Sequence, residues 1–215
     1  MRILAISDTH SNFSRIPDIL DKSGDIDLVI VAGDITNFGP DDHALELLNM
    51  FEVPVFAIPG NCDLRSIIDT IEKSDAINLH KRVQVFQDVT FIGIGGSNPT
   101  PFKTPFEIEE KDIALSLEKL LSDAKKNHGY IVLLSHAPPF GTLDRVNNKN
   151  VGCKSISRML GKVDLIVSGH IHEDRGVMEK QGTTVINTGM TSDGSAALID
   201  LDAASHKINV TMIQV

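Results

Sequence analysis

Apolar runs of strand length alternate with amphipathic segments in the first third of the chain. Each run is followed by polar residues, and each segment between two runs carries apolar side chains at helical spacing. This alternation is typical of β–α–β units, in which right-handed crossovers join parallel strands. The pattern predicts strands at residues 1–6, 27–33 and 53–58, and helices at residues 12–24, 41–48 and 64–74.

The pattern changes after the third helix, where antiparallel pairing is expected. Residues 83–86 and 89–94 are two β-rich runs separated by two polar residues, which predicts a hairpin. The next segment, residues 97–106, contains too much proline for a helix or a central strand. Two interpretations of this loop stay open: it places Phe102 and Phe106 in the core, or it forms a rim over a binding site.

The remaining pattern completes an α/β fold. Two more helices and two more strands are predicted, at residues 107–127, 154–160, 130–134 and 165–167. From residue 183 onward, short β-rich runs separated by turn residues predict a second, antiparallel layer. We therefore expect residues 1–215 to form one domain, in which two mixed β-sheets pack as a sandwich flanked by helices.

Length and composition place the chain among ordinary globular proteins. At 215 residues it is of single-domain size, and its 41% hydrophobic and 23% charged residues exclude disordered and collagen-like classes. The net charge of -9 opposes the phosphate contacts that carry most nucleic-acid affinity, so a nucleic-acid partner is disfavoured. The sequence does not decide between a monomer and a homo-oligomer.

Cysteine usage and hydropathy favour a cytoplasmic location. Cys62 and Cys153 are too few for a disulfide framework, which fits a reducing compartment. The apolar run at residues 1–6 is too short for a signal peptide, and no apolar stretch approaches the roughly 20 residues that span a bilayer. We therefore expect no membrane attachment.

Side chains that can bind metal ions follow several of the predicted strands. Because the carboxyl ends of neighbouring parallel strands open onto one crevice, these side chains are expected to converge. Carboxylate and amide oxygens crowded in one crevice need cations between them, since they would otherwise repel one another or stay unsatisfied. Mixed oxygen and imidazole donors suit Mn, Fe or Zn better than Ca or Mg. The candidate metal ligands are Asp8, His10, Asp34, Asn61, His136, His170 and His172.

Each of these residues has a simpler interpretation when it is taken alone. Aspartate and asparagine are common in turns and caps, and a lone histidine is usually a surface residue or a hydrogen-bonded core residue. The candidates differ because each follows a strand and completes a motif. The simpler interpretation is kept for His43, His80, His128 and His206.

The candidate ligands stand in short motifs, which in chain order are D-T-H from Asp8, G-D ending at Asp34, G-N-C-D from Gly60, a lone His136, and G-H-I-H ending at His172. Together they resemble the pattern of the calcineurin-like metallophosphoesterase superfamily, in particular its small prokaryotic phosphoesterases. The resemblance spans most of the chain. It implies a four-layer α/β/β/α fold, with the two sheets between the helices.

The resemblance also implies a dinuclear metal centre. The expected cofactor is a pair of divalent ions, with Mn preferred and Fe, Zn, Ni or Co as alternatives. One ion would be held by Asp8, His10 and His172, the other by Asn61, His136 and His170, and Asp34 would bridge both.

The expected activity is hydrolysis of a small phosphate ester. A hydroxide shared by the two ions would attack a phosphodiester, or less favourably a phosphomonoester, with no covalent intermediate. A nuclease is disfavoured by the acidic charge, and a catalytically weak scaffold of the same fold is disfavoured because every ligand position is filled. The candidate catalytic residues are Asp34, Asn61, Cys62 and His170.

Cys62 departs from the family pattern, which has histidine at this place. In the family, that histidine stabilises the transition state or protonates the departing oxygen. A thiol with a reference pKa of about 8.5 is mostly protonated at pH 7, but it is a weaker hydrogen-bond donor than imidazolium and carries no charge. We therefore expect low turnover and a preference for substrates whose leaving group needs little protonation.

Two further polar residues have two interpretations each. Asp63 either supports the metal ligands through hydrogen bonds or caps a helix. Arg145 either binds a phosphate group with two hydrogen bonds or, as is more common, pairs with a neighbouring carboxylate.

Overall fold

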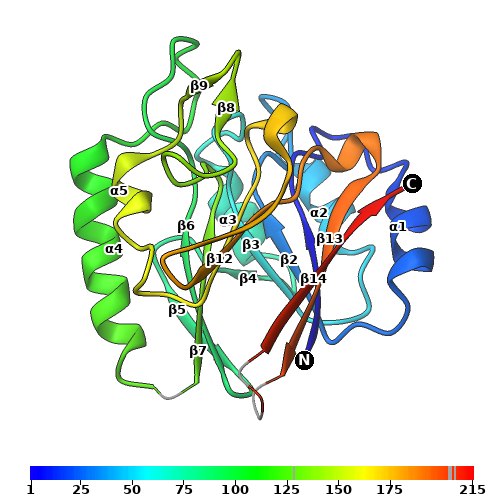
Figure 1. Cartoon of the computed structure of the whole chain (residues 1–215). Helices are drawn as coiled ribbons and strands as arrows, with labels where there is room; N and C mark the ends of the chain where they lie inside the picture. The colour runs from blue at the N-terminus through cyan, green and yellow to red at the C-terminus, as the bar shows by residue number, and fades with distance from the viewer. Residues whose placement is uncertain (128, 203–204, 206) are drawn as a thin grey trace.

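Two six-stranded β-sheets face each other in a computed structural model that describes residues 1–127, 129–202, 205 and 207–215 (Figure 1). Across sheet A, the strands are β14 (Lys207–Gln214), β13 (Ser195–Asp202), β1 (Arg2–Ile6), β2 (Leu28–Ala32), β3 (Val55–Ile58) and β4 (Ile77–Asn78). Across sheet B, they are β11 (Gly176–Lys180), β12 (Thr183–Asn187), β10 (Leu165–Ser168), β7 (Tyr130–Ser135), β6 (Val89–Ile94) and β5 (Val83–Phe86).

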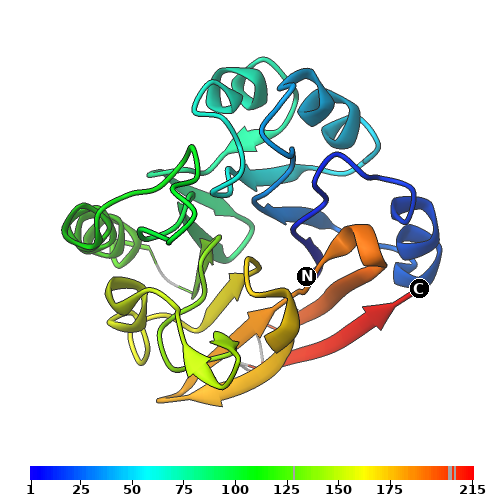
Figure 2. The ribbon, with the colours of Figure 1, turned by 90° about the horizontal axis from the view of Figure 1, so that it is seen from above.

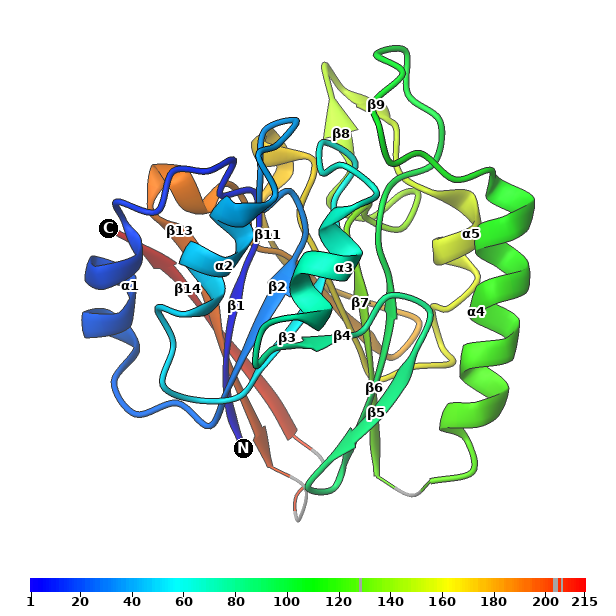
Figure 3. The ribbon, with the colours of Figure 1, turned by 180° about the vertical axis from the view of Figure 1, so that it is seen from behind.

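The helices cover the outer faces of the two sheets (Figures 2 and 3). Sheet A is covered by α1 (Ile16–Ser23), α2 (Asp42–Leu48) and α3 (Ile67–Glu72), and sheet B is covered by α4 (Glu110–Ala124) and α5 (Lys154–Ser157). The predicted fold class, two mixed sheets in a sandwich flanked by helices, is confirmed. No helix within the described ranges is long and apolar enough to cross a membrane.

Strand side chains alternate between two apolar layers. In β1, Ile3 and Ala5 pack between the sheets, whereas Leu4 and Ile6 pack against the helices of sheet A. This alternation follows from the two-residue period of a strand, and it explains why the central strands are apolar on both faces. All four of these side chains are fully buried.

The central strands of each sheet are parallel, and this arrangement positions their carboxyl ends. In sheet A, β1, β2 and β3 run in the same direction, and in sheet B, β6, β7 and β10 do so. The chain passes from sheet A to sheet B at residues 79–81, where the Leu79 N–H donates to Ala57 O and the Lys81 N–H donates to Gly93 O. After β6, the Gly96 N–H donates to Pro59 O, after β3, at 2.9 Å, so the carboxyl ends of the parallel strands of both sheets meet at one edge of the sandwich.

The helices are shorter than the sequence pattern predicts. Helix α1 begins at Ile16, because the Asn12 side chain accepts hydrogen bonds from the Ser14 N–H and hydroxyl and forms a turn before it. Similarly, α3 covers Ile67–Glu72, α4 covers Glu110–Ala124 and α5 ends at Ser157. The predicted hairpin of β5 and β6 is confirmed as an antiparallel pair.

The prediction of a separate antiparallel layer at the C-terminal end is wrong. Strand β12 pairs in parallel with β10 in sheet B, whereas β13 pairs antiparallel with β1 in sheet A. The C-terminal strands are therefore shared between the two sheets. Hydrophobic alternation fixes the face of a strand but not its partner, so the sequence could not distinguish these arrangements.

The proline-rich loop at residues 97–106 places one of its two phenylalanines in the core, and its interpretation as a rim over the site stays a prediction. Phe106 is buried, and its N–H donates to Asn61 O at 3.1 Å, whereas Phe102 is 84% exposed. Only one phenylalanine therefore lies in the core. The other stands at the tip of a loop beside the strand end that carries Asn61.

Candidate metal centre

The structure brings all the candidate ligands to one edge of the sandwich. Each residue stands at or just beyond the carboxyl end of a parallel strand, or in the short helix η1 (His172–Asp174) that follows β10. Sheet A supplies oxygen donors and one imidazole, and sheet B supplies imidazoles only. In strand order they are Asp8 and His10 after β1, Asp34 after β2, Asn61 after β3, His136 after β7, and His170 and His172 after β10.

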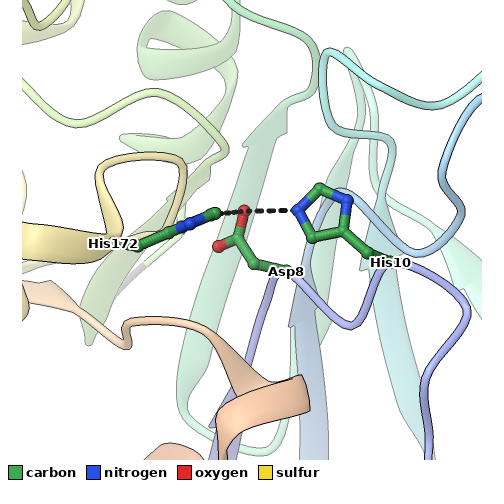
Figure 4. Close-up of side chains that lie close together, drawn as sticks. All are labelled: Asp8, His10 and His172. Carbon is green, nitrogen blue, oxygen red and sulfur yellow. Dashed lines mark hydrogen bonds and ion pairs between the residues drawn. The ribbon is translucent and has the colours of Figure 1, made fainter.

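The first donor cluster consists of Asp8, His10 and His172, whose ligand atoms all lie within 4.8 Å of one another (Figure 4). His172 Nε2 is 3.1 Å from Asp8 Oδ1, and His10 Nε2 is 3.9 Å from the same oxygen. Asp8 is fully buried, whereas the two histidines are partly exposed. The cluster therefore has a buried carboxylate at its base and opens toward solvent through its imidazoles.

The second donor cluster consists of Asp34, His136 and His170. His136 Nδ1 lies 2.8 Å from Ala32 O, and because a carbonyl only accepts, this nitrogen carries the hydrogen. His136 Nε2 then faces the cluster, 3.3 Å from Asp34 Oδ2 and 2.9 Å from Asn61 Oδ1. A backbone carbonyl in this position is the usual way to fix the tautomer of a metal-binding histidine.

Asp34 connects the two clusters. One of its oxygens lies 3.8 Å from His10 Nε2, and the Cys62 N–H donates to the other at 2.7 Å. Cys62 Sγ groups with His10 and Asp34 within the same 4.8 Å limit, and the Asn61 amide lies 3.5 Å from the sulfur. Cys62 therefore stands beside the carboxylate that both clusters share.

Two glycines allow the strand ends to approach this closely. A Cβ atom on Gly60 would lie 2.1 Å from Asp34 Oδ1, and one on Gly169 would lie 2.1 Å from Asp8 Oδ2. Real Cβ atoms do not come this near to other heavy atoms, so only glycine fits at either place. The glycine before Asn61 and the glycine before His170 are therefore needed for the carboxylates behind them.

Four of the candidate ligands have a strained backbone. Asp8, His10, Asp34 and His170 all have left-handed φ values, between 45° and 68°. Such conformations cost free energy for residues other than glycine and persist where the surrounding structure fixes them. Here hydrogen bonds do so, since the Asp8 N–H donates to Gly33 O and the His10 N–H donates to Asp34 O, both at 3.0 Å.

The charges of the cluster are balanced by protons on imidazole. Burial disfavours the ionised form of Asp34, but the charges of His136 and His10 outweigh burial and hold the pKa of Asp34 far below its usual range. Burial also disfavours protonation of His136, yet Asp34 raises the pKa of His136 to about 9. In the first cluster, burial opposes ionisation of Asp8, but the hydrogen bond from His172 lowers the Asp8 pKa.

The donor set therefore fits divalent cations. Two buried carboxylates stay ionised only with positive charge beside them, and imidazoles supply it only by holding protons. Burial and the charge of His136 lower the pKa of His170 to about 4, so His170 offers a neutral imidazole at pH 7. A cation would replace the protons and accept the same lone pairs.

Asp63 connects two loops of sheet A and does not cap a helix. Its carboxylate accepts hydrogen bonds from Ile35 N–H (3.2 Å), Thr36 N–H (2.7 Å), Thr36 hydroxyl (2.9 Å) and Gly60 N–H (2.7 Å). Burial and the charge of Asp34 raise the pKa of Asp63 to about 6, although the donated hydrogen bonds oppose this shift. Asp63 thereby fixes the segments that carry Asp34 and Asn61.

Arg145, His43 and His80 lie outside the clusters. Arg145 pairs with Asp174, with its Nη2 2.9 Å from Asp174 Oδ1 and its Nε 3.1 Å from Oδ2. His80 Nδ1 accepts a hydrogen bond from the Gly95 N–H at 2.9 Å, as expected for a structural histidine. His43 is in neither cluster, and His128 and His206 lie outside the described residues.

The structure also shows supporting residues that the sequence did not indicate. The Ser7 hydroxyl donates to Asp8 Oδ2, and Thr188 Oγ1 lies 2.7 Å from the same hydroxyl. The Thr191 N–H donates to Ser7 O at 3.0 Å, so the segment after β12 lies directly beneath Asp8. These residues follow no ligand motif, and only the pairing of β12 beside β10 brings them here.

A two-sheet α/β/β/α fold with carboxylates and imidazoles gathered at one edge is the arrangement expected of a metal-dependent phosphoric ester hydrolase. The chain belongs to the calcineurin-like phosphoesterase family, whose model matches residues 1–174. The resemblance seen in the motifs is thereby confirmed.

Individual proteins are similar to this chain in sequence or in fold. The chain is 34% identical to the uncharacterised protein MJ1162 of Methanocaldococcus jannaschii over 198 residues, which cover 87% of each protein. Its fold is similar to TT1561 of Thermus thermophilus (TM-score 0.72, 15% identity, 98% and 97% of the two chains). It is also similar to a dimetal phosphatase of Danio rerio (TM-score 0.67, 11% identity, 100% and 96%).

Proposed function

We propose that this chain is a dinuclear phosphoesterase that hydrolyses small phosphodiesters in preference to phosphomonoesters. The observation that carries the proposal is the position of Asp34, which lies in contact distance of donors from both clusters. A single carboxylate shared between two sets of imidazoles suits two ions better than one. The domain spans residues 1–215.

The proposed ligand sets follow the two clusters. The bound metal pair would activate water for attack and neutralise the charge that gathers on the phosphoryl oxygens. Mn is the proposed metal. One ion would be held by Asp8, His10 and His172, the other by Asn61, His136 and His170, with Asp34 shared by both.

The chain's own groups keep these donors in place and in the right protonation state. The Ala32 carbonyl holds the hydrogen of His136 on Nδ1, so that Nε2 stays directed at the cluster. The Cys62 N–H and the strained backbone of Asp34 orient the shared carboxylate. These contacts exist before substrate binds, so little reorganisation is needed during the reaction.

Cys62 is proposed as the group nearest the departing oxygen. Burial and the charge of Asp34 raise the pKa of the Cys62 thiol, so the sulfur keeps its proton. A neutral thiol donates weakly, and we therefore propose slow turnover and a preference for good leaving groups. Both cysteines are free, as a reducing cytoplasm requires.

The test is hydrolysis of bis-p-nitrophenyl phosphate and p-nitrophenyl phosphate by protein that has been stripped of metal and refilled with Mn. We expect diester hydrolysis to return with Mn, to exceed monoester hydrolysis, and to be lost in Asp34→Asn. Asp123→Asn is the matched control, because Asp123 is an acid on α4 that pairs with Lys126 away from the clusters. Two bound ions without hydrolysis of either ester, or full activity in Asp34→Asn, would overturn the proposal.

A further inference from the structure

The loop after Asp34 places an aromatic residue beside the metal centre. The Phe38 N–H donates to Cys62 O at 3.0 Å, and Cys62 Sγ groups with His10 and Asp34. A Cβ atom on Gly39 would lie 3.2 Å from Leu64 Cδ1, so Leu64 packs against the backbone of the same loop. The backbone of Phe38 and the side chain of Leu64 therefore lie in the loops next to Cys62, the residue proposed to stand nearest the departing oxygen.

Phe38 is an energetically unfavourable residue at this position. Its φ of 61° lies in the left-handed region, where a bulky side chain strains the backbone and glycine or asparagine does not. Its side chain is also 55% exposed, so burial of the ring does not compensate for the strain. Strained residues of this kind are typical of functional sites.

Exposure alone would not single out Phe38, because scattered apolar side chains are common on protein surfaces. Val85 is 45% exposed on edge strand β5, and Phe102 is 84% exposed at a loop tip. Among the large apolar residues that are exposed in the described part of the chain, Phe38 alone also has a left-handed φ. Both features together indicate a ring that is held in place for a partner.

We infer that Phe38, with Leu64 beside it, receives a planar ring on the substrate while the phosphoryl group lies at the metal centre. The substrate class is then a phosphodiester with an aryl group or a nucleobase on one ester arm. Rings stack on phenylalanine with useful affinity and with little demand for hydrogen bonds. The inference rests on the proposed phosphoesterase function and narrows its substrate.

The test measures binding of phosphonates that cannot be hydrolysed, by titration calorimetry on the Mn-loaded protein. Phenylphosphonate and methylphosphonate differ only in the ring. We expect the wild type to bind phenylphosphonate more tightly, and we expect Phe38→Ala to reduce this preference by about three- to tenfold. Phe38→Tyr should keep the preference, and Val85→Ala is the control for loss of an exposed apolar side chain elsewhere.

A nucleoside 5′-phosphonate distinguishes the two sources of the ring. Tighter binding than phenylphosphonate, lost in Phe38→Ala, would assign a nucleobase, and weaker binding would assign an aryl ester. No preference for the ring in the wild type, or the same preference in Phe38→Ala, would overturn the inference. Ring-dependent binding by a protein that hydrolyses no ester would overturn the proposed function and the substrate class inferred here, and would leave only a role for Phe38 in binding ring-bearing ligands.

A second measurement separates binding from folding. Phe38→Asn removes both the strain and the ring, so its melting temperature should equal or exceed that of the wild type. A lower melting temperature would show that the ring is kept for packing, which would contradict the inference.

Discussion

The two sheets contribute chemically different halves of the candidate metal centre. Sheet A supplies the carboxylates of Asp8 and Asp34, whereas sheet B supplies imidazoles, including His136 and His170. Each donor cluster takes members from both sheets, so neither half is complete alone. The centre therefore forms only when the sheets have packed against each other, and the apolar layer between them holds its geometry.

The halves also differ in how their donors are held. In sheet A, left-handed backbone holds Asp8, His10 and Asp34, and the Asp63 hydrogen bonds fix the loops that carry Asp34 and Asn61. In sheet B, the ring of His136 is fixed by the carbonyl of Ala32, which belongs to sheet A. Asp8 in turn is held from sheet B, since the His170 N–H donates to Asp8 Oδ2 at 3.0 Å, so each half depends on the other.

The largest effect is expected from substitutions that prevent two strand ends from approaching each other closely, either within sheet A or between the two sheets. Gly60→Ala places a methyl group on Asp34 within sheet A, and Gly169→Ala places one on Asp8 across the sheets. Each should lower kcat/KM by more than about a hundredfold and cost about 1–3 kcal/mol of unfolding free energy. Metal analysis should find both ions of the proposed pair lost in Gly60→Ala, because the proposed ligand sets share Asp34, and one retained in Gly169→Ala.

Gly24→Ala is the control for these substitutions. A Cβ atom at Gly24 would meet nothing within 4 Å, although its φ of 63° strains the backbone. This variant should lose some stability and keep both ions and full activity. Equal metal content in all three variants would show that close approach does not hold the centre.

The sequence indicated the candidate ligands of both sheets equally well, but it did not indicate how the residues around them are arranged. Each ligand follows an apolar run, so the strand pattern and the motifs together indicated every member of both clusters. The Asp63 hydrogen bonds and the support from Thr188 depend on which strands are neighbours, and hydrophobic alternation does not record this. The exposure of Phe102 depends on loop geometry, for which proline content gives only the absence of regular structure.

The next largest effect concerns the stability of the loops of sheet A that carry Asp34 and Asn61. Asp63→Ala leaves the buried N–H groups of Thr36 and Gly60 without their acceptor. We expect a loss of about 3–5 kcal/mol in urea unfolding, since each unsatisfied buried donor costs about 1–3 kcal/mol. Asp21→Ala removes an exposed acid of α1 and should change stability by less than about 0.5 kcal/mol. An equally small loss for Asp63→Ala would show that water replaces the carboxylate.

A smaller effect is expected at His80, which lies where the chain passes from sheet A to sheet B and forms an isolated β-bridge with Gly93. Burial and the charge of Lys81 lower the pKa of His80 to about 4. The unfolded chain, with a histidine pKa of about 6.5, therefore binds more protons between pH 4 and 6.5, and stability rises with pH across this window. Between about pH 4 and 6.5, the free energy of unfolding of the wild type should rise by about 3 kcal/mol because of His80, and the rise should be complete above about pH 6.5. His80→Asn should lack this rise.

The measurement is urea unfolding of metal-free wild type and His80→Asn from about pH 4.5 to 7. Because the histidines of the metal centre titrate in both proteins, the difference between the two curves isolates His80. Parallel curves would contradict a neutral, buried His80.

The smallest effect should come from placing a further imidazole among the donors of sheet A, at residue 62. Cys62→His offers a cationic donor beside Asp34, where the thiol is protonated and weakly polar. For a methyl p-nitrophenyl diester the leaving group needs no proton, and turnover should change little. For a dialkyl or alkyl phosphate ester the departing alkoxide needs one, and turnover should rise about tenfold or more. Cys62→Ala should match the wild type on the p-nitrophenyl diester. An equal change in turnover on both ester types would mean that residue 62 acts on metal binding through Asp34. The two sheets would then differ only in the ligands that they supply.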